Sequence, residues 1–205
     1  VLTSAYDNAY RSYIAGVGAK PTPPTSEQLR SQFETDLNKV KAISDELIFH
    51  SVKYRPLFGD DSEGALQATF KVVKAQGSTL SDNEIKTLVI DAVNDFFAIG
   101  NWEFGDSFHF TELATFVQLN ITPNIANFVI VPRNSTQVFG SLFEITSRSD
   151  EIFISTATVD NVEIIDSVTA ANLKADGNVV TSIDQVTGNV SVASGSSTSS
   201  SGSSY

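Results

Sequence analysis

Side chains that commonly do chemistry are sparse and scattered in this sequence. Its two histidines are His50, in an alternating apolar run, and His109, between two phenylalanines. Neither has a second histidine, a cysteine or a glutamate at the spacing of a zinc site. A catalytic imidazole or a metal site would need such neighbours, so we expect both histidines to be structural.

Two groups of carboxylates have types that could bind a cation or move a proton. Asp60, Asp61 and Glu63 lie in a turn-rich segment, but their spacing differs from that of a calcium loop. Asp91 and Asp95 are four residues apart on the polar face of a predicted helix. Paired carboxylates can do acid–base work, and such a pair would make a small enzyme conceivable. We favour the interpretation that the first group belongs to a solvated acidic loop and that the second lies on a solvated helix face.

Other signatures of catalysis or ligand binding are incomplete. Many serines are present, but no G-x-S-x-G nucleophile elbow occurs. Gly16 and Gly18 are not followed by a phosphate-binding glycine pattern. Trp102 and Phe104 could stack a ligand, although we favour a role for Trp102 in closing the core where two helices meet. The sequence therefore predicts a protein that is not an enzyme, with no catalytic residue, cofactor or metal.

Composition narrows the possible classes of function further. The 205 residues are 41% hydrophobic and 18% charged, which favours a packed core over disorder. The absence of cysteine excludes disulfides and thiolate metal sites. A net charge of −11 opposes binding to nucleic acid or anionic lipid, and no apolar run approaches the ~20 residues that span a bilayer. Because the chain starts at Val1 and contains no methionine, we expect a fragment of a longer protein.

Residues 1–45 are predicted to form a helical arm and a linker. The first helix, Ala5–Ile14, carries three tyrosines at spacings of three and four, which favours packing over ligand stacking: Tyr6, Tyr10 and Tyr13. The proline-rich stretch 20–24 breaks the helix and stiffens the chain. A second helix is expected over Ser26–Ile43, capped by Thr25 or Ser26.

Residues 46–135 are predicted to form a mixed α/β module. Strands are expected at 47–52, 68–73 and 128–131, with a short helix at 111–119. Ser81 and Glu84 form a capping box that starts the clearest helix, over 81–99, and Gly100 is expected to end it. The helix is predicted to bury one stripe against strand residues. The stripe is Ile85, Leu88, Val89, Ala92, Val93 and Phe96, and the strand residues are Phe70, Val72, Val129 and Val131.

Residues 136–193 are predicted to form a β-rich module. Strands are expected at 143–145, 152–154 and 162–165, and a hairpin at 179–192. The Ser/Gly-rich residues 194–205 are expected to be a flexible tail. The fold class is therefore α+β, with a helical N-terminal segment, a module of strands with two packed helices, and a β-rich module.

The stretch from Gln67 to Pro132 has a specific order: strand, capped helix, tryptophan-containing turn, short helix, buried strand. It resembles the C-terminal α/β module of the baseplate J-like proteins of contractile phage tails. Its local sequence resembles in particular that of the large ring-forming wedge proteins of T4-like phages. The resemblance extends to about residue 166. It is carried by Leu80–Glu84, Ile85–Phe97, Asn101–Gly105, Phe108–Leu113, Phe128–Pro132, Phe139–Ile145, Glu151–Ile154 and Ala157–Val162.

The resemblance implies a virion protein of the tail baseplate, assembled in the host cytoplasm. Proteins of this kind dimerise, close a ring around the central hub, and bind neighbouring wedge and hub subunits during contraction. The expected partners are thus a second copy and other baseplate proteins, without nucleic acid or membrane insertion. The alternative is a surface- or carbohydrate-binding tail protein with its site around Trp102 and nearby tyrosines.

The candidate self-association surface lies in the β-rich region. It consists of Phe139, Leu142, Phe143, Ile152, Phe153 and Ile154. Successive side chains of a strand point to opposite faces, so one module is expected to leave an apolar face or an unpaired edge for a second copy. The other possibility is that neighbouring strands of the same chain cover both faces.

Overall fold

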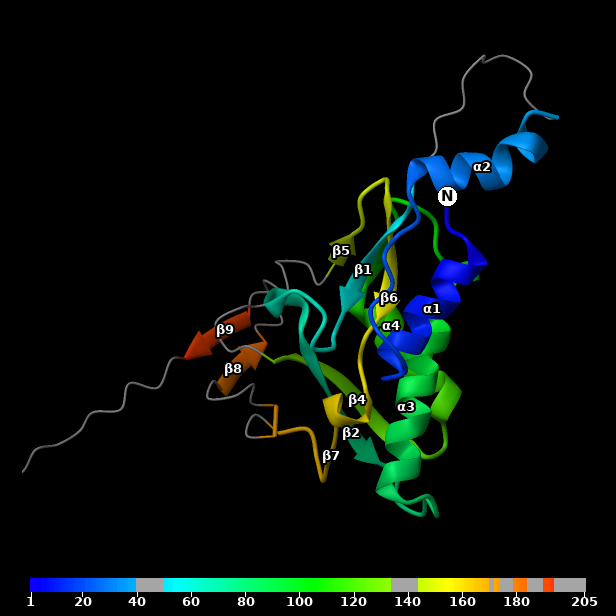
Figure 1. Cartoon of the computed structure of the whole chain (residues 1–205). Helices are drawn as coiled ribbons and strands as arrows, with labels where there is room; N and C mark the ends of the chain where they lie inside the picture. The colour runs from blue at the N-terminus through cyan, green and yellow to red at the C-terminus, as the bar shows by residue number, and fades with distance from the viewer. Residues whose placement is uncertain (40–49, 134–143, 170–171, 174–178, 184–189, 194–205) are drawn as a thin grey trace, which may run out of the picture.

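The computed structural model describes residues 1–39, 50–133, 144–169, 172–173, 179–183 and 190–193. It has the predicted α+β composition (Figure 1). The helices are α1 (Ser4–Ile14), α2 (Ser26–Leu37), α3 (Asp82–Phe96) and α4 (Phe110–Ile121). The strands are β1 (Lys53–Leu57), β2 (Ala68–Lys74), β3 (Ser107–His109), β4 (Ile125–Pro132), β5 (Glu144–Thr146), β6 (Glu151–Ser155), β7 (Val162–Ile165), β8 (Val179–Ile183) and β9 (Val190–Ala193).

Strands that are far apart in the sequence pair with one another. β2 is the centre of a three-stranded sheet, antiparallel to β4 and parallel to β7. β1 pairs in parallel with β6, and β3 pairs with β5. β8 and β9 form the predicted antiparallel pair. The predicted modules 46–135 and 136–193 therefore share three of these sheets.

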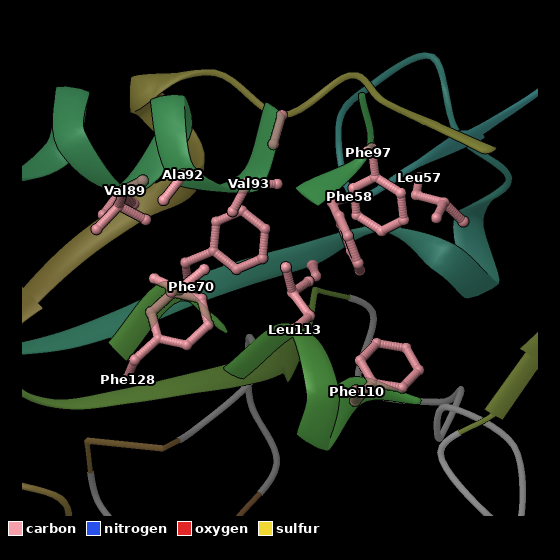
Figure 2. Packing of buried hydrophobic residues seen from close by; sticks show 14 of the residues in the cluster. Leu57, Phe58, Phe70, Val89, Ala92, Val93, Phe97, Phe110, Leu113 and Phe128 are labelled. Carbon is pink, nitrogen blue, oxygen red and sulfur yellow. The ribbon is translucent and has the colours of Figure 1, made fainter. Parts of the chain in front are cut away.

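The main core lies between the three-stranded sheet and helices α3 and α4. Alternate residues of β2, including Phe70 and Val72, face the helices and are fully buried. Figure 2 shows Phe70 and Phe128 packed beneath Val93. The ring centroids of Phe70 and Phe128 are 5.5 Å apart. Because both helices lie on one face of the sheet, each buries a single apolar stripe.

Helix α3 confirms most of its predicted stripe and corrects part of it. Ile85, Val89, Ala92 and Val93 are buried, but Leu88 is 38% exposed. The fully buried aromatic residue is Phe97, whereas Phe96 is only half-buried. A helix buries a limited arc, and Leu88 lies at the edge of that arc. The helix ends at Phe96, and Gly100 falls in a short 3-10 turn instead of ending it.

The predicted contact of this helix with Val129 and Val131 is wrong. Val129 pairs with Lys71 and Val131 with Thr69, so both valines lie on the sheet face opposite Phe70. Phe128 and Ile130 are the β4 residues that pack in the core. A shift of one residue in strand register moves every side chain to the other face of the sheet. Because residues 128–131 are all apolar, the sequence does not show which of them face the helices.

The first helix is not a detached arm, because α1 packs on the β1–β6 pair. Its capping residue Thr3 accepts a hydrogen bond from the backbone N–H of Tyr6 at 3.2 Å. Tyr6 and Tyr10 contact Ile154 of β6 in a second, smaller cluster. The predicted second helix begins at Ser26 as expected but ends at Leu37, so residues 38–39 form a turn instead of continuing it; residues 40–43 of that prediction lie outside the described residues.

The strand predicted over 47–52 is only partly described. Residues 47–49 lie outside the described residues, while 50–52 are not in a strand and β1 begins at Lys53. Phe58, just after β1, has a φ of 72° in the left-handed region, and its ring is fully buried. Backbone hydrogen bonds to Leu66 and from Ala68, both 3.0 Å, hold this conformation and direct the ring into the core.

Candidate functional site

The tyrosines that share one face of α1 form an aromatic cluster with a fourth tyrosine from β1. Tyr54 packs against Tyr6 and Tyr10, with ring centroids 5.6 and 4.5 Å apart. The predicted packing role of the α1 tyrosines is therefore confirmed for Tyr6 and Tyr10, which are 8% and 4% exposed. Sequence periodicity showed the shared face, but gave no signal that Tyr54 would join it.

Carboxylates accept hydrogen bonds from two of the phenol groups of this cluster. The Tyr54 hydroxyl donates to Asp7 Oδ1 at 2.6 Å, and Arg11 Nε donates to both oxygens of Asp7 at 3.1 Å. Tyr13 donates to Asp61 Oδ1 at 2.9 Å. Burial raises the pKa of Tyr10 to about 12, and burial together with the hydrogen bond to Asp7 raises the pKa of Tyr54. Both phenols therefore stay neutral well above physiological pH.

A proline-rich segment forms the other wall of this site. We call residues 20–24 the proline strap. The Lys20 ammonium lies 5.8 Å from the Tyr10 ring centroid and 5.7 Å from that of Tyr13, within cation–π range. The strap and the cluster enclose a groove of about 580 Å³, the tyrosine groove, lined by Tyr6, Tyr10, Lys20, Pro21, Thr22, Pro23, Lys53, Tyr54 and Pro56.

The groove is chemically a docking surface. It offers proline rings, aromatic edges and two lysine ammonium groups, while the Tyr54 hydroxyl already has a carboxylate partner. Aromatic-lined grooves bind extended proline-rich segments through such contacts. This arrangement suits the non-covalent binding of a partner.

Trp102 has the role in the core that the sequence favoured. Its indole N–H donates to the Phe96 carbonyl oxygen at 2.7 Å, and its ring stacks on Phe97 with centroids 5.5 Å apart. Edge-to-face contacts with Phe108 and Phe153 complete the packing. The expected neighbour Phe104 is 47% exposed. The tyrosines belong to the separate α1 cluster, so Trp102 and the tyrosines do not form one site.

Asp60 and Asp61 make structural contacts through their side chains, and His50 makes one through its backbone. His50 accepts a hydrogen bond on its carbonyl oxygen from the N-terminal ammonium at 2.7 Å, and His109 is the residue preceding α4. Asp60 pairs with Arg133, and Asp61 accepts the Tyr13 hydroxyl. Within the described part of the chain, no group of three or more His, Cys, Asp or Glu side chains could hold a metal ion. Asp91 and Asp95 are exposed, as expected for a solvated helix face.

The candidate self-association residues divide into two sets. Phe139, Leu142 and Phe143 lie outside the described residues. Ile152, Phe153 and Ile154 belong to β6 and are 4%, 1% and 1% exposed. Phe153 points into the main core, while Ile154, on the opposite face, packs under α1. At these three positions the chain itself covers both faces, which is the second of the two arrangements considered from the sequence.

Comparison with known proteins adds no identification. No protein-family model matches the chain, and no curated protein matches it. In the part of the chain that the structure describes, no helix is long and apolar enough to cross a membrane.

Proposed function

We propose that the chain is a structural component of a contractile phage tail baseplate. In this role it self-associates to build the wedge ring around the central hub and holds neighbouring wedge subunits during contraction. Its place is the virion, after assembly in the host cytoplasm. The proposal depends on the resemblance of residues 67–166 to ring-forming wedge proteins.

The observation that carries the proposal is the packing of the segment with that resemblance. β2 and β4 enclose the first part of this segment, residues 67–132, and they pair from Ala68 opposite Pro132 to Lys74 opposite Ile125. Between them, α3 and α4 pack on one face of the sheet. The tryptophan turn is locked by the hydrogen bond from Trp102 to Phe96. This packing supports a structural role for the segment.

The polar groups singled out in the sequence are used in the same structural way. Asp61 ties α1 to the loop after β1 through Tyr13, and Asp60 ties that loop to Arg133 at the end of β4. Asp7, which the sequence did not single out, also bridges α1 and β1 through Tyr54. These cross-links join segments that are distant in the sequence and agree with a structural role.

The tyrosine groove favours a second candidate, a surface- or carbohydrate-binding tail protein, since sugars stack on aromatic rings. However, the ring faces of Tyr6 and Tyr10 are almost fully covered. A sugar would therefore meet the groove's edges and prolines instead of an open aromatic face.

Electron microscopy of the purified chain, combined with a glycan array, separates the two candidates. The wedge proposal predicts two-fold particles or arcs and rings at high protein concentration, and no glycan binding. Lys20→Ala together with Tyr54→Phe serves as the matched variant, because both changes alter the groove while leaving the main core intact. Isolated monomeric particles that bind a glycan, with binding lost in the variant, would contradict the wedge proposal and support the second candidate.

A further inference from the structure

We infer that the proline strap and helix α2 are exchanged between two copies of the chain. In the exchanged dimer, the strap of each copy lies against the α1 tyrosines of the other copy and forms the second wall of its tyrosine groove. This inference specifies the contact behind the self-association, and thus rests on the function proposed above. The segment that takes this position comes from a second copy of this chain, because the strap is what lies against the α1 tyrosines within the single chain.

The strap is held by contacts that are easily broken and re-formed. Three of its five residues, Pro21, Pro23 and Pro24, have no backbone N–H to donate. Across the described residues, no backbone hydrogen bond joins 18–24 to the rest of the chain. The contacts are the Lys20 cation–π interactions and the groove wall formed by the strap itself. None of them requires the strap to come from the same chain.

A glycine hinge precedes the strap. Helix α1 ends in a Schellman-type turn, in which Gly16 N–H donates to Tyr13 O at 2.9 Å and Val17 N–H donates to Ser12 O at 2.8 Å. Gly16 and Gly18 have φ values of 78° and 87°, and a Cβ at either position would meet no atom within 4 Å. Packing therefore does not require glycine at these positions. The positive φ values favour glycine, because a residue with a Cβ rarely adopts them. Rotation at Gly18 redirects the strap and leaves α1 in place.

Helix α2 can move with the strap as one piece. Its capping box is internal, with the Thr25 N–H donating to Gln28 Oε1 at 2.8 Å and the Gln28 N–H donating to Thr25 Oγ1 at 3.2 Å. In Figure 1, α2 extends away from the sheets and from the C-terminal half of α1. Leu29 is nevertheless fully buried, and Phe33 is half-buried. The same apolar stripe can pack on a second copy when the strap crosses over.

Exchange re-forms between two copies the contacts that the strap makes within one chain. It therefore changes the oligomeric state while the fold of each copy stays the same. Swapping identical segments is a low-cost route to a two-fold dimer. Within one chain, a short linker gives the strap an effective concentration in the millimolar range. Neighbouring copies in a ring would face each other at comparable concentrations, which allows the strap to cross.

The absence of native cysteine allows a clean test in the full chain. Thr22→Cys places one thiol on the strap, and Lys53→Cys places one on the groove wall; both positions are exposed. The two variants, one of them isotope-labelled, are mixed at high concentration and treated with a short bismaleimide. In the control mixture, the strap variant is combined with Leu119→Cys, on the exposed side of α4, instead of with the groove variant. Circular dichroism checks that each variant is folded, and sedimentation is run on the same samples before cross-linking.

Exchange predicts a mixed dimer of the strap and groove variants, several-fold above the control and rising with concentration. A chain that carries both cysteines should then cross-link between copies as well as within itself. If the samples sediment as dimers but the strap cross-links only within its own chain, the exchange is overturned and the proposed self-association stands. If the samples are monomeric throughout, both are overturned. A monomer that binds a separate proline-rich peptide would assign the groove to another partner and also overturn the exchange.

Discussion

Truncating Phe153 distinguishes a core residue from a contact residue on the surface. The sequence placed this side chain among candidates for self-association, whereas the structure places it in the main core at 1% exposure. Its ring lies 5.3 Å from Trp102, 5.3 Å from Phe108 and 6.3 Å from Phe97, measured between centroids. Phe153→Ala should therefore destabilise the single chain.

The magnitude follows from the burial and from the aromatic contacts. Removing a fully buried phenylalanine side chain costs about 3–5 kcal/mol of unfolding free energy, including the cavity that remains. Three aromatic neighbours lose contact with the Phe153 ring, and each such pair adds about 0.5–1.5 kcal/mol, which favours the upper part of that range. With a urea slope of about 2 kcal/mol/M, the unfolding midpoint should fall by about 2 M.

Urea unfolding followed by tryptophan fluorescence is a direct assay, because Trp102 is the single tryptophan and touches Phe153. Phe104→Ala is the matched control: it is the same substitution at a 47% exposed position, with an expected change of about 0.5–1 kcal/mol. Phe153→Leu, with an expected loss of about 1–2 kcal/mol, keeps the comparison usable if the alanine variant does not fold. A loss below about 1 kcal/mol for Phe153→Ala, with a change only in association, would refute the placement.

Two further predictions concern α3 and the tyrosines. Ser81→Ala should lower the unfolding free energy by about 1 kcal/mol in the same urea assay, because the Ser81 hydroxyl accepts the Glu84 N–H; an unchanged midpoint would contradict the capping role. In an absorbance titration, Tyr10 should ionise near its raised pKa of about 12, and Tyr54 should also ionise above its ordinary pKa. The folded chain keeps protons that the unfolded chain loses above pH about 10, so stability should fall as pH rises from about 10 to 12. Normal ionisation of all tyrosines near pH 10 in the folded chain would contradict this.

The parts of the fold with local signals were predictable from the sequence. Ser81 and Glu84 specify the start of α3 through hydrogen bonds three residues apart, and Thr25 does the same for α2. Trp102 could be assigned to the core because it lies between two predicted helices. Such signals depend on a few neighbouring residues, so one sequence is enough to read them.

The parts that failed depend on partners distant in the sequence. Val129 and Val131 could not be assigned to a sheet face, because their strand is apolar on both sides and its register is set by β2. Ile154 was a candidate contact for a second copy, with coverage by the same chain as the alternative, and α1, about 140 residues earlier in the sequence, covers it. The tyrosine groove was missed for the same reason: Tyr54 and the proline strap reach the α1 tyrosines only in the folded chain.

Sedimentation velocity of the purified chain over micromolar concentrations, at low and raised salt, tests the central claim of self-association most directly. The net charge of −11 opposes contact between copies. Raising the ionic strength from about 0.01 M to about 0.1 M shortens the screening length from about 30 Å to about 10 Å. The account predicts a monomer–dimer equilibrium that shifts toward the dimer with concentration and with salt. A single monomeric species at every concentration and salt would contradict it.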